Sequence, residues 1–135
     1  GPKVSANTYV SFDYFMSIDT PNNKAFLEKF KAKFGQDALV NTVGVGMYNA
    51  AHMAAMAIAK AGEVSTKALR ANLKGLTFDK APQGSVTMRE QDNQAIVPSY
   101  LMKVRDNWTG VNDMFEKIQS LDRAVPVDAR CDLPL

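Results

Sequence analysis

The side chains that could act as a base, a nucleophile or a metal ligand are sparse in this 135-residue chain, which has one histidine and one cysteine. Any serine–histidine or cysteine–histidine pair would have to use His52, which stands among alanines and methionines. A histidine in such surroundings is more often a packing residue than a base. One histidine and one cysteine cannot make a zinc site. We therefore predict no catalytic residue, no metal and no cofactor, and a protein that is not an enzyme.

An aromatic cluster in residues 9–15 is the densest group of binding-competent side chains. Such residues in a strand-to-loop position either line an apolar pocket with polar handles or pack within a sheet, and the sequence leaves both interpretations open. The glycines at 44 and 46 lack the third glycine of a dinucleotide fingerprint. The carboxylates are scattered, which predicts solvated surface. The cluster consists of Tyr9, Phe12, Tyr14 and Phe15.

Composition bounds the class of protein. Sixteen basic and 14 acidic residues give a net charge of +2 and no basic stripe, so we expect neither nucleic acid nor an anionic membrane as partner. The longest apolar region, residues 44–62, contains Asn49, His52 and Lys60 and predicts a buried helix without membrane insertion. A hydrophobic content of 46% suits one core, so residues 1–135 are predicted to form a single domain, with 111–135 as an extension or tail. Cys131 is predicted to be an inert thiol.

Residues 21–34 have the signals of a complete helix. Thr20 can cap the first turn, and Pro21 suits the first helical position. Phenylalanines at 26, 30 and 34 form a stripe among lysines, which predicts a surface helix packed on a sheet. Gly35 is predicted to end it as a left-handed cap.

The remaining elements alternate in type. Residues 4–15 predict a strand running into a loop. Helices are expected near 44–61, with Asn41 as a cap candidate, and over 65–73. Two β-rich runs follow, at 85–89 and 95–104, and helical spacing predicts a helix over 111–121. This order predicts an α/β fold, a layered sheet with flanking helices.

Four segments carry a family resemblance: "YFMSIDTPNNKAFLEKFKAKFG", "MYNAAHMAAMAIAKAG", "LKGLTFDKAPQGSVTMREQDNQ" and "YLMKVRDNW". Over roughly residues 7–108 the chain resembles the C-terminal part of type I periplasmic solute-binding proteins, within them the urea and short-chain amide branch of the branched-chain amino-acid binding group. The resemblance implies a truncated chain that spans parts of both lobes. It places a hinge at Asn41, Thr42 and Val43. Exposed sheet edges then imply completion by strand or domain swapping, and favour a homodimer.

The resemblance also implies the site and the activity. It places Ala6 and Asn7 in the ligand cleft, with Thr8 and Tyr9 adjoining, and glycine is expected where Asn7 stands. It implies a periplasmic, non-enzymatic component of an ABC uptake system that binds a small polar solute, such as urea, a short-chain amide or a branched-chain amino acid, and signals to an ABC permease. The chain has no leader peptide, which says nothing of compartment. The alternatives are an amide-sensing regulator of the same fold and a fragment that only self-associates.

Overall fold

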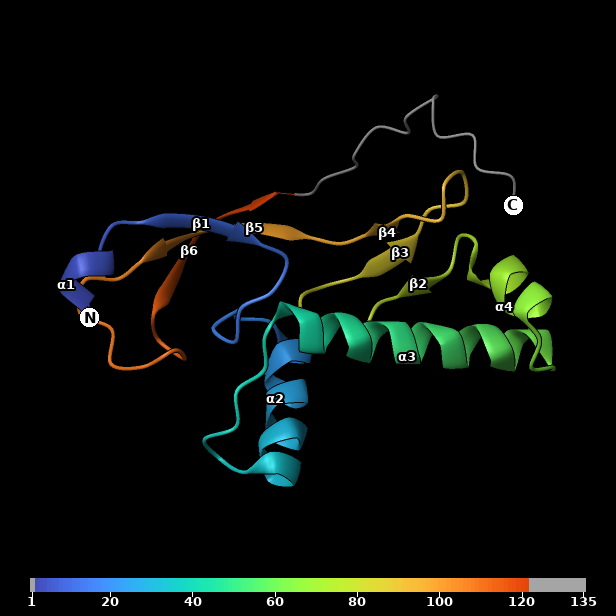
Figure 1. Ribbon diagram of the computed structural model, residues 1–135, viewed down its shortest axis with the longest axis horizontal. Coiled ribbons are helices and arrows are strands. Elements are labelled where there is room, and N and C mark those ends of the chain that lie inside the picture. The colour runs from blue at the N-terminus through green and yellow to red at the C-terminus, as the bar shows by residue number, and fades with distance from the viewer. Residues whose placement is uncertain (1, 122–135) are drawn as a thin grey trace.

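The computed structural model describes residues 2–121, which form an elongated arrangement of four helices and six strands (Figure 1). The prediction of a mixed α/β fold is confirmed. In chain order the elements are α1 (Pro2–Ser5), β1 (Tyr9–Phe12), α2 (Pro21–Phe34), α3 (Thr42–Ala61), α4 (Thr66–Leu73), β2 (Thr77–Phe78), β3 (Val86–Met88), β4 (Ala95–Ile96), β5 (Ser99–Val104) and β6 (Phe115–Leu121).

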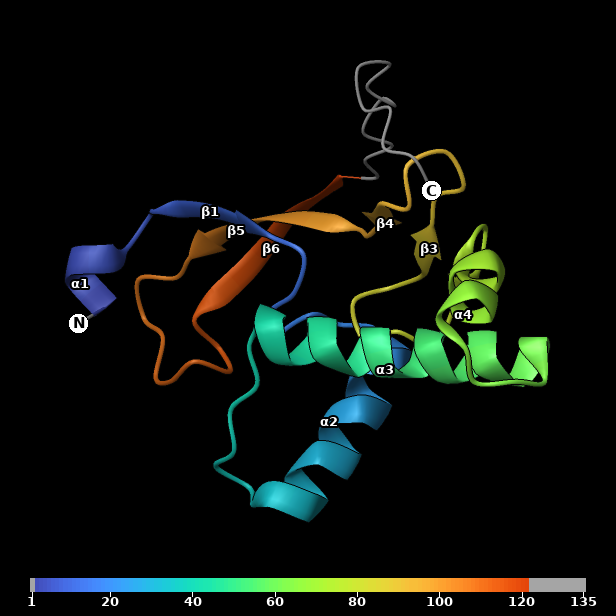
Figure 2. The ribbon, with the colours of Figure 1, turned by 45° about the vertical axis from the view of Figure 1, so that its right-hand side comes forward.

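The strands form two three-stranded sheets in which every described pairing is antiparallel. One sheet has the order β1-β5-β6, with Tyr9 opposite Lys103 and Phe12 opposite Tyr100. The other has the order β2-β3-β4. Helix α3 runs beneath the second sheet, and α4 lies beside the C-terminal end of α3 (Figures 1 and 2). Helix α2 projects away from both sheets. Pro98 separates β4 from β5, which is where a residue without an N–H group can interrupt a ladder.

The capping residues act at three helix starts as the sequence predicts. The side chains of Thr20, Asn41 and Ser65 accept hydrogen bonds from backbone N–H groups three residues ahead. Gly62 ends α3 in the left-handed conformation, with φ 72° and ψ 4°. Gly35 has φ 103° and ψ 156°, so the prediction of a left-handed cap is wrong there. A positive φ still favours glycine at that position.

The phenylalanine stripe of α2 packs only at its first member. Phe26 contacts Tyr48 of α3 with ring centroids 4.9 Å apart and packs against the core beside the first sheet. Phe30 is half-buried, and Phe34 is 61% exposed. The prediction that this stripe packs on a sheet is therefore wrong for Phe34, because α2 projects away from both sheets (Figure 1).

The segment at 111–121 corrects a second prediction. Phe115–Leu121 is strand β6 and not a helix. Its backbone groups complete the outer side of β5, from Phe115 opposite Val104 to Leu121 opposite Ser99. Pairing with an existing strand edge overrides a local helical spacing of apolar residues, because β-structure depends on neighbours more than on propensity. The predicted strand over 4–15 is also shorter: its start is the end of α1, and only Tyr9–Phe12 pairs.

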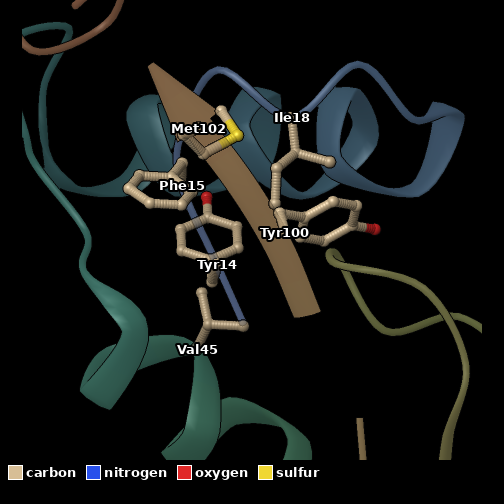
Figure 3. Packing of buried hydrophobic residues seen from close by; sticks show 6 residues of the cluster. All are labelled: Tyr14, Phe15, Ile18, Val45, Tyr100 and Met102. Carbon is tan, nitrogen blue, oxygen red and sulfur yellow. The ribbon is translucent and has the colours of Figure 1, made fainter. Parts of the chain in front are cut away.

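Two clusters of buried apolar side chains form the core. The first joins the β1–α2 loop, the start of α3 and strand β5 (Figure 3). The second lies between α3 and the β2-β3-β4 sheet. The first contains Tyr14, Phe15, Ile18, Val45, Tyr100 and Met102, and the second contains Met53, Phe78, Ala81 and Val86.

Candidate functional site

Of the four residues that the resemblance places in or beside a ligand cleft, Ala6, Asn7 and Thr8 lie between α1 and β1, and Tyr9 is the first residue of β1. Asn7 donates its N–H to the Val104 carbonyl at 3.1 Å, and the Thr8 carbonyl accepts from Val104 N–H at 2.9 Å. Asn7 has φ 62°, so it adopts the left-handed conformation that glycine would adopt at this position. Ala6 is half-buried, and Tyr9 is 57% exposed. Their role as ligand contacts stays a prediction.

The three residues predicted to form a hinge lie at the start of α3. Asn41 is its N-cap, and its side-chain oxygen accepts from Gly44 N–H at 3.0 Å. The Thr42 hydroxyl donates to the Asp13 carboxylate, which ties α3 to the loop after β1. Val43 is 67% exposed. Hinge motion at these residues stays a prediction as well.

A pocket of about 440 Å3 opens beside these hinge residues. The aromatic cluster of the sequence supplies one wall, since Phe12 and Phe15 meet edge to face with centroids 5.5 Å apart. Phe115 of β6 closes on Phe15 at 4.5 Å. We call it the aromatic pocket. Its lining residues are Phe12, Tyr14, Phe15, Met16, Leu39, Val40, Asn41, Thr42, Val111 and Phe115.

Members of the aromatic cluster therefore both line a pocket and pack within the fold. Tyr14 and Phe15 are buried in the first core and also line the pocket, whereas Phe12 is 50% exposed at its rim. Tyr9 lies at the other end of β1 and is not among the lining residues. The structure thus places Asn41 and Thr42, two of the residues predicted to form a hinge, in the lining of the pocket, but not Ala6 to Tyr9.

Three side-chain oxygens in the lining of the aromatic pocket are already paired. The Tyr14 hydroxyl donates to Asn23 Oδ1 at 3.0 Å, and burial raises the pKa of Tyr14 above its ordinary value, so the phenol stays neutral. The Asn41 side chain caps α3, and the Thr42 hydroxyl is bound to Asp13. Such a lining binds the apolar body of a small molecule and offers few free partners for a polar head.

Sequence reasoning missed part of this lining. Leu39 and Val40 lie in the connector before α3, and Val111 and Phe115 come from a segment expected to be helical. No local pattern marks these residues as pocket walls, because they come together only in the tertiary structure; Phe115, for example, is placed by the pairing of β6 with β5. Asn23 was missed for the same reason: it is 1% exposed and holds Tyr14 from the first turn of α2.

His52 packs on aromatic rings. It stacks on Phe78 with centroids 5.0 Å apart and planes at 10°, and it meets Tyr48 at 4.4 Å. Within residues 2–121 no group of three histidine, cysteine, aspartate or glutamate side chains could hold a metal ion. Cys131 lies outside the described residues.

A model of the periplasmic binding protein family matches residues 1–109. The chain belongs to this family. The predicted family is thereby confirmed, on a match that covers most of the chain.

Solved structures of this family have the same fold. The amino acid ABC transporter substrate-binding protein from Pseudomonas fluorescens Pf-5 is 24% identical, with a TM-score of 0.81 over 100% of this chain and 36% of that one. The leucine-, isoleucine-, valine-, threonine- and alanine-binding protein from Brucella ovis is 17% identical, with a TM-score of 0.78 over 95% of this chain and 35% of that one.

The chain is also similar to an aromatic-acid complex of the same fold and to one further protein. The ABC transporter solute-binding protein from Rhodopseudomonas palustris BisB5, in complex with 3,4-dihydroxybenzoic acid, is 21% identical, with a TM-score of 0.75 over 87% of this chain and 31% of that one. A protein named limonene hydroxylase, from Geobacillus stearothermophilus, is 25% identical over 126 residues, 93% of this chain and 22% of that protein. The chain thus spans about a third or less of the proteins it matches.

None of the helices within residues 2–121 combines the length and apolarity needed to cross a bilayer. This finding agrees with the sequence reading of residues 44–62 as a core helix: α3 buries Val45, Asn49, Met53 and Ala57 along one face.

Proposed function

We propose that this chain is part of a non-enzymatic, periplasmic solute-binding component that delivers a small solute to an ABC permease. The observation that carries the proposal is the aromatic pocket at the start of α3, in a chain that belongs to the periplasmic binding protein family. The solved relatives are solute-binding proteins of ABC transporters, which supports this class of activity.

The lining of the aromatic pocket favours one solute among the three that the resemblance implies. Urea and short amides need several free hydrogen-bond partners, whereas the hydroxyl groups of Tyr14 and Thr42 are already bound to Asn23 and Asp13. A branched-chain amino acid presents an apolar side chain to Phe12 and Phe15 and keeps its charged groups at the pocket mouth. We therefore favour a branched-chain amino acid over urea or an amide.

An aromatic carboxylic acid is a second candidate. An exposed aromatic side chain such as Phe12, at the lining of the pocket, can also stack on a ligand's planar ring or meet its edge. A structure with the same fold binds 3,4-dihydroxybenzoic acid. This solute would suit the same pocket with the carboxylate at the mouth.

A matched pair of variants tests which part of β1 carries binding. Phe12→Ala and Tyr9→Ala remove aromatic rings of similar exposure, 50% and 57%, from the two ends of one strand. Titration calorimetry with leucine, isoleucine, valine, 4-hydroxybenzoate, urea and acetamide should show one selective ligand, lost in Phe12→Ala and retained in Tyr9→Ala. The reverse result would restore Ala6 to Tyr9 as the site, and no binding of any probe would remove the proposal for this chain.

Self-association is the alternative with a structural basis. Strands β1 and β6 form the outer edges of the first sheet within the described residues, and unpaired edges can recruit strands of a second copy. The proposed homodimer would show as a mass that doubles with concentration in light scattering. An amide-sensing regulator would differ in binding a protein partner and not a permease.

A further inference from the structure

A second pocket, of about 400 Å3, lies between α3 and the β2-β3-β4 sheet. We call it the acceptor pocket. It shares no lining residue with the aromatic pocket. Its walls are apolar except at three positions. The lining residues are Asp13, Gly46, Asn49, Ala50, Met53, Ala54, Leu73, Gln83, Val86, Met88, Ala95 and Val97.

Two of the three polar residues have buried oxygens without a partner. Asn49 is 4% exposed and Gln83 is 1% exposed. Within residues 2–121, Asn49 Oδ1 and Gln83 Oε1 are the buried side-chain atoms that make no hydrogen bond. A buried acceptor without a donor loses its contact with water and gains no hydrogen bond in return, so such atoms call for an explanation. Two of them in the lining of one pocket indicate that a donor-bearing molecule belongs there.

The backbone that carries these two side chains is held in place. Asn49 lies in the middle of α3, a helix of 20 residues. The backbone around Gln83 is fixed from two sides: Thr20 Oγ1 donates to the Pro82 carbonyl at 2.8 Å, and the Tyr100 hydroxyl donates to the Gln83 carbonyl. Asn22 Nδ2 also holds the same loop through the Asp79 carbonyl at 2.7 Å. The acceptors are thus preorganised for an external donor.

The charge of the lining selects the kind of donor. Asp13 is the charged residue of the acceptor pocket, and the lining has no lysine or arginine. Its carboxylate accepts from the Thr42 hydroxyl and has capacity for further donors. An ammonium group offers three donors and a positive charge, which matches one carboxylate and two amide oxygens.

The size and apolarity of the remaining walls select the body that carries the ammonium group. Met53, Leu73 and Val97 offer only apolar contacts. Gly46, Ala50 and Ala54 lie on the same side of α3 at helical spacing and leave room on that side. We propose that the acceptor pocket binds a small organic cation, a primary ammonium group on an apolar body, held by Asn49, Gln83 and Asp13.

A set of probes of equal length tests this on the unmodified chain. Hexylammonium, 1-hexanol and hexanoate share an apolar body and differ in the head group. Titration calorimetry should show saturable binding of hexylammonium, about tenfold or more weaker binding of hexanol, and still weaker binding of hexanoate, because hydrogen bonds to charged groups contribute about 1.5–3 kcal/mol. Binding of hexanoate as tight as that of hexylammonium would overturn the proposal, and so would no binding of hexylammonium.

Variants then assign the binding to this pocket. Asn49→Leu removes one acceptor at nearly constant volume and should weaken hexylammonium binding about tenfold. Asn107→Leu, at an exposed position outside the lining, is the matched control and should leave binding unchanged. Gln83→Met is a second test should Asn49→Leu fold poorly. Unchanged affinity in both acceptor variants would overturn the assignment, while the leucine titrations of the aromatic pocket would remain interpretable on their own.

Discussion

The two cores of this chain differ in whether their buried polar side chains have hydrogen-bond partners. In the first, Asn23 is 1% exposed and fully used: it accepts from the Tyr14 hydroxyl and donates through Nδ2 to the carbonyls of Met16 and Ile18 at 3.0 and 2.8 Å. In the second, Asn49 is 4% exposed, and its side-chain oxygen has no partner. A buried asparagine therefore completes a hydrogen-bond network in one core, whereas the side-chain oxygen of a buried asparagine in the other core has no donor.

This difference separates structural polar groups from polar groups available to a ligand. Each hydrogen bond of Asn23 joins α2 to the loop that precedes it, so the network fixes how α2 leaves the first core. The side-chain oxygens of Asn49 and Gln83 make no hydrogen bond within the described residues and carry the desolvation cost of burial. We infer that the first core holds the architecture together and that the second has retained binding capacity.

Truncating one buried methionine in each core should give the largest effects. Met102 is fully buried among aromatic residues, so Met102→Ala should lower the free energy of unfolding by about 4 kcal/mol. Met53 lines the acceptor pocket, so Met53→Ala enlarges an existing space and should cost only about 2 kcal/mol. Urea denaturation measures both, with Met47→Ala as the exposed control. Equal costs would contradict the view that the second core is the more open.

Replacing the two buried asparagines by leucine should have effects of different sign. Asn23→Leu removes the partner of the Tyr14 hydroxyl and the Asn23 donor of the Met16 carbonyl, and should cost about 3 kcal/mol. The Ile18 carbonyl also loses Asn23 but keeps the backbone N–H of Thr20. Asn49→Leu removes an unpaired oxygen and should be neutral or stabilising by up to about 1 kcal/mol. Chemical denaturation of both variants gives the comparison. A loss at Asn49 as large as that at Asn23 would show that Asn49 has a structural partner.

Tyr100 provides one of the side-chain connections between the two cores. Tyr100 belongs to the first core, and its hydroxyl donates to the carbonyl of Gln83, which lines the acceptor pocket. Tyr100→Phe should lower the free energy of unfolding by about 1–2 kcal/mol. It should also weaken hexylammonium binding by loosening Gln83. Tyr9→Phe, at an exposed tyrosine on β1, should change neither quantity.

Acid should loosen the outer turns of both sheets. Backbone N–H groups of Gly110 and the hydroxyl of Thr109 lower the pKa of Asp113 below its ordinary 3.8, and a hydrogen bond from Arg89 lowers that of Asp92. A lowered folded pKa means that the stabilisation is complete above 3.8 and is lost as the pH falls through the lowered values. NMR titration should show the β5–β6 and β3–β4 turns changing only below that pH. High salt should affect Asp92, which pairs with a cation, more than Asp113.

The sequence predicted the helices well because their signals are local. Thr20, Asn41 and Ser65 each cap the helix that follows, and Gly62 ends α3 as expected. It failed at Phe115–Leu121, where an apolar spacing typical of a helix belongs to a strand. The hydrogen bonds that make this segment a strand come from its neighbour β5. The pattern of residues within the segment itself does not show that such a neighbour is present.

The candidate site was predicted only in part, because some of its residues come from segments that meet only in the folded chain. The aromatic cluster was found, and Phe12, Tyr14 and Phe15 do line a pocket. The prediction could not include Phe115, nor could it find the acceptor pocket, whose polar residues lie 34 positions apart in Asn49 and Gln83. Residue type alone does not show whether a buried amide is paired.

By itself, therefore, the sequence determined the α/β class, the approximate bounds of α2, α3 and α4 and the family resemblance, because caps, periodicity and residue order act within a few turns of the chain. Only the tertiary structure decided which apolar residues meet and which buried oxygens find a donor. Those outcomes depend on backbone groups brought together from distant segments, as when Tyr100 reaches the Gln83 carbonyl and Asn23 receives Tyr14.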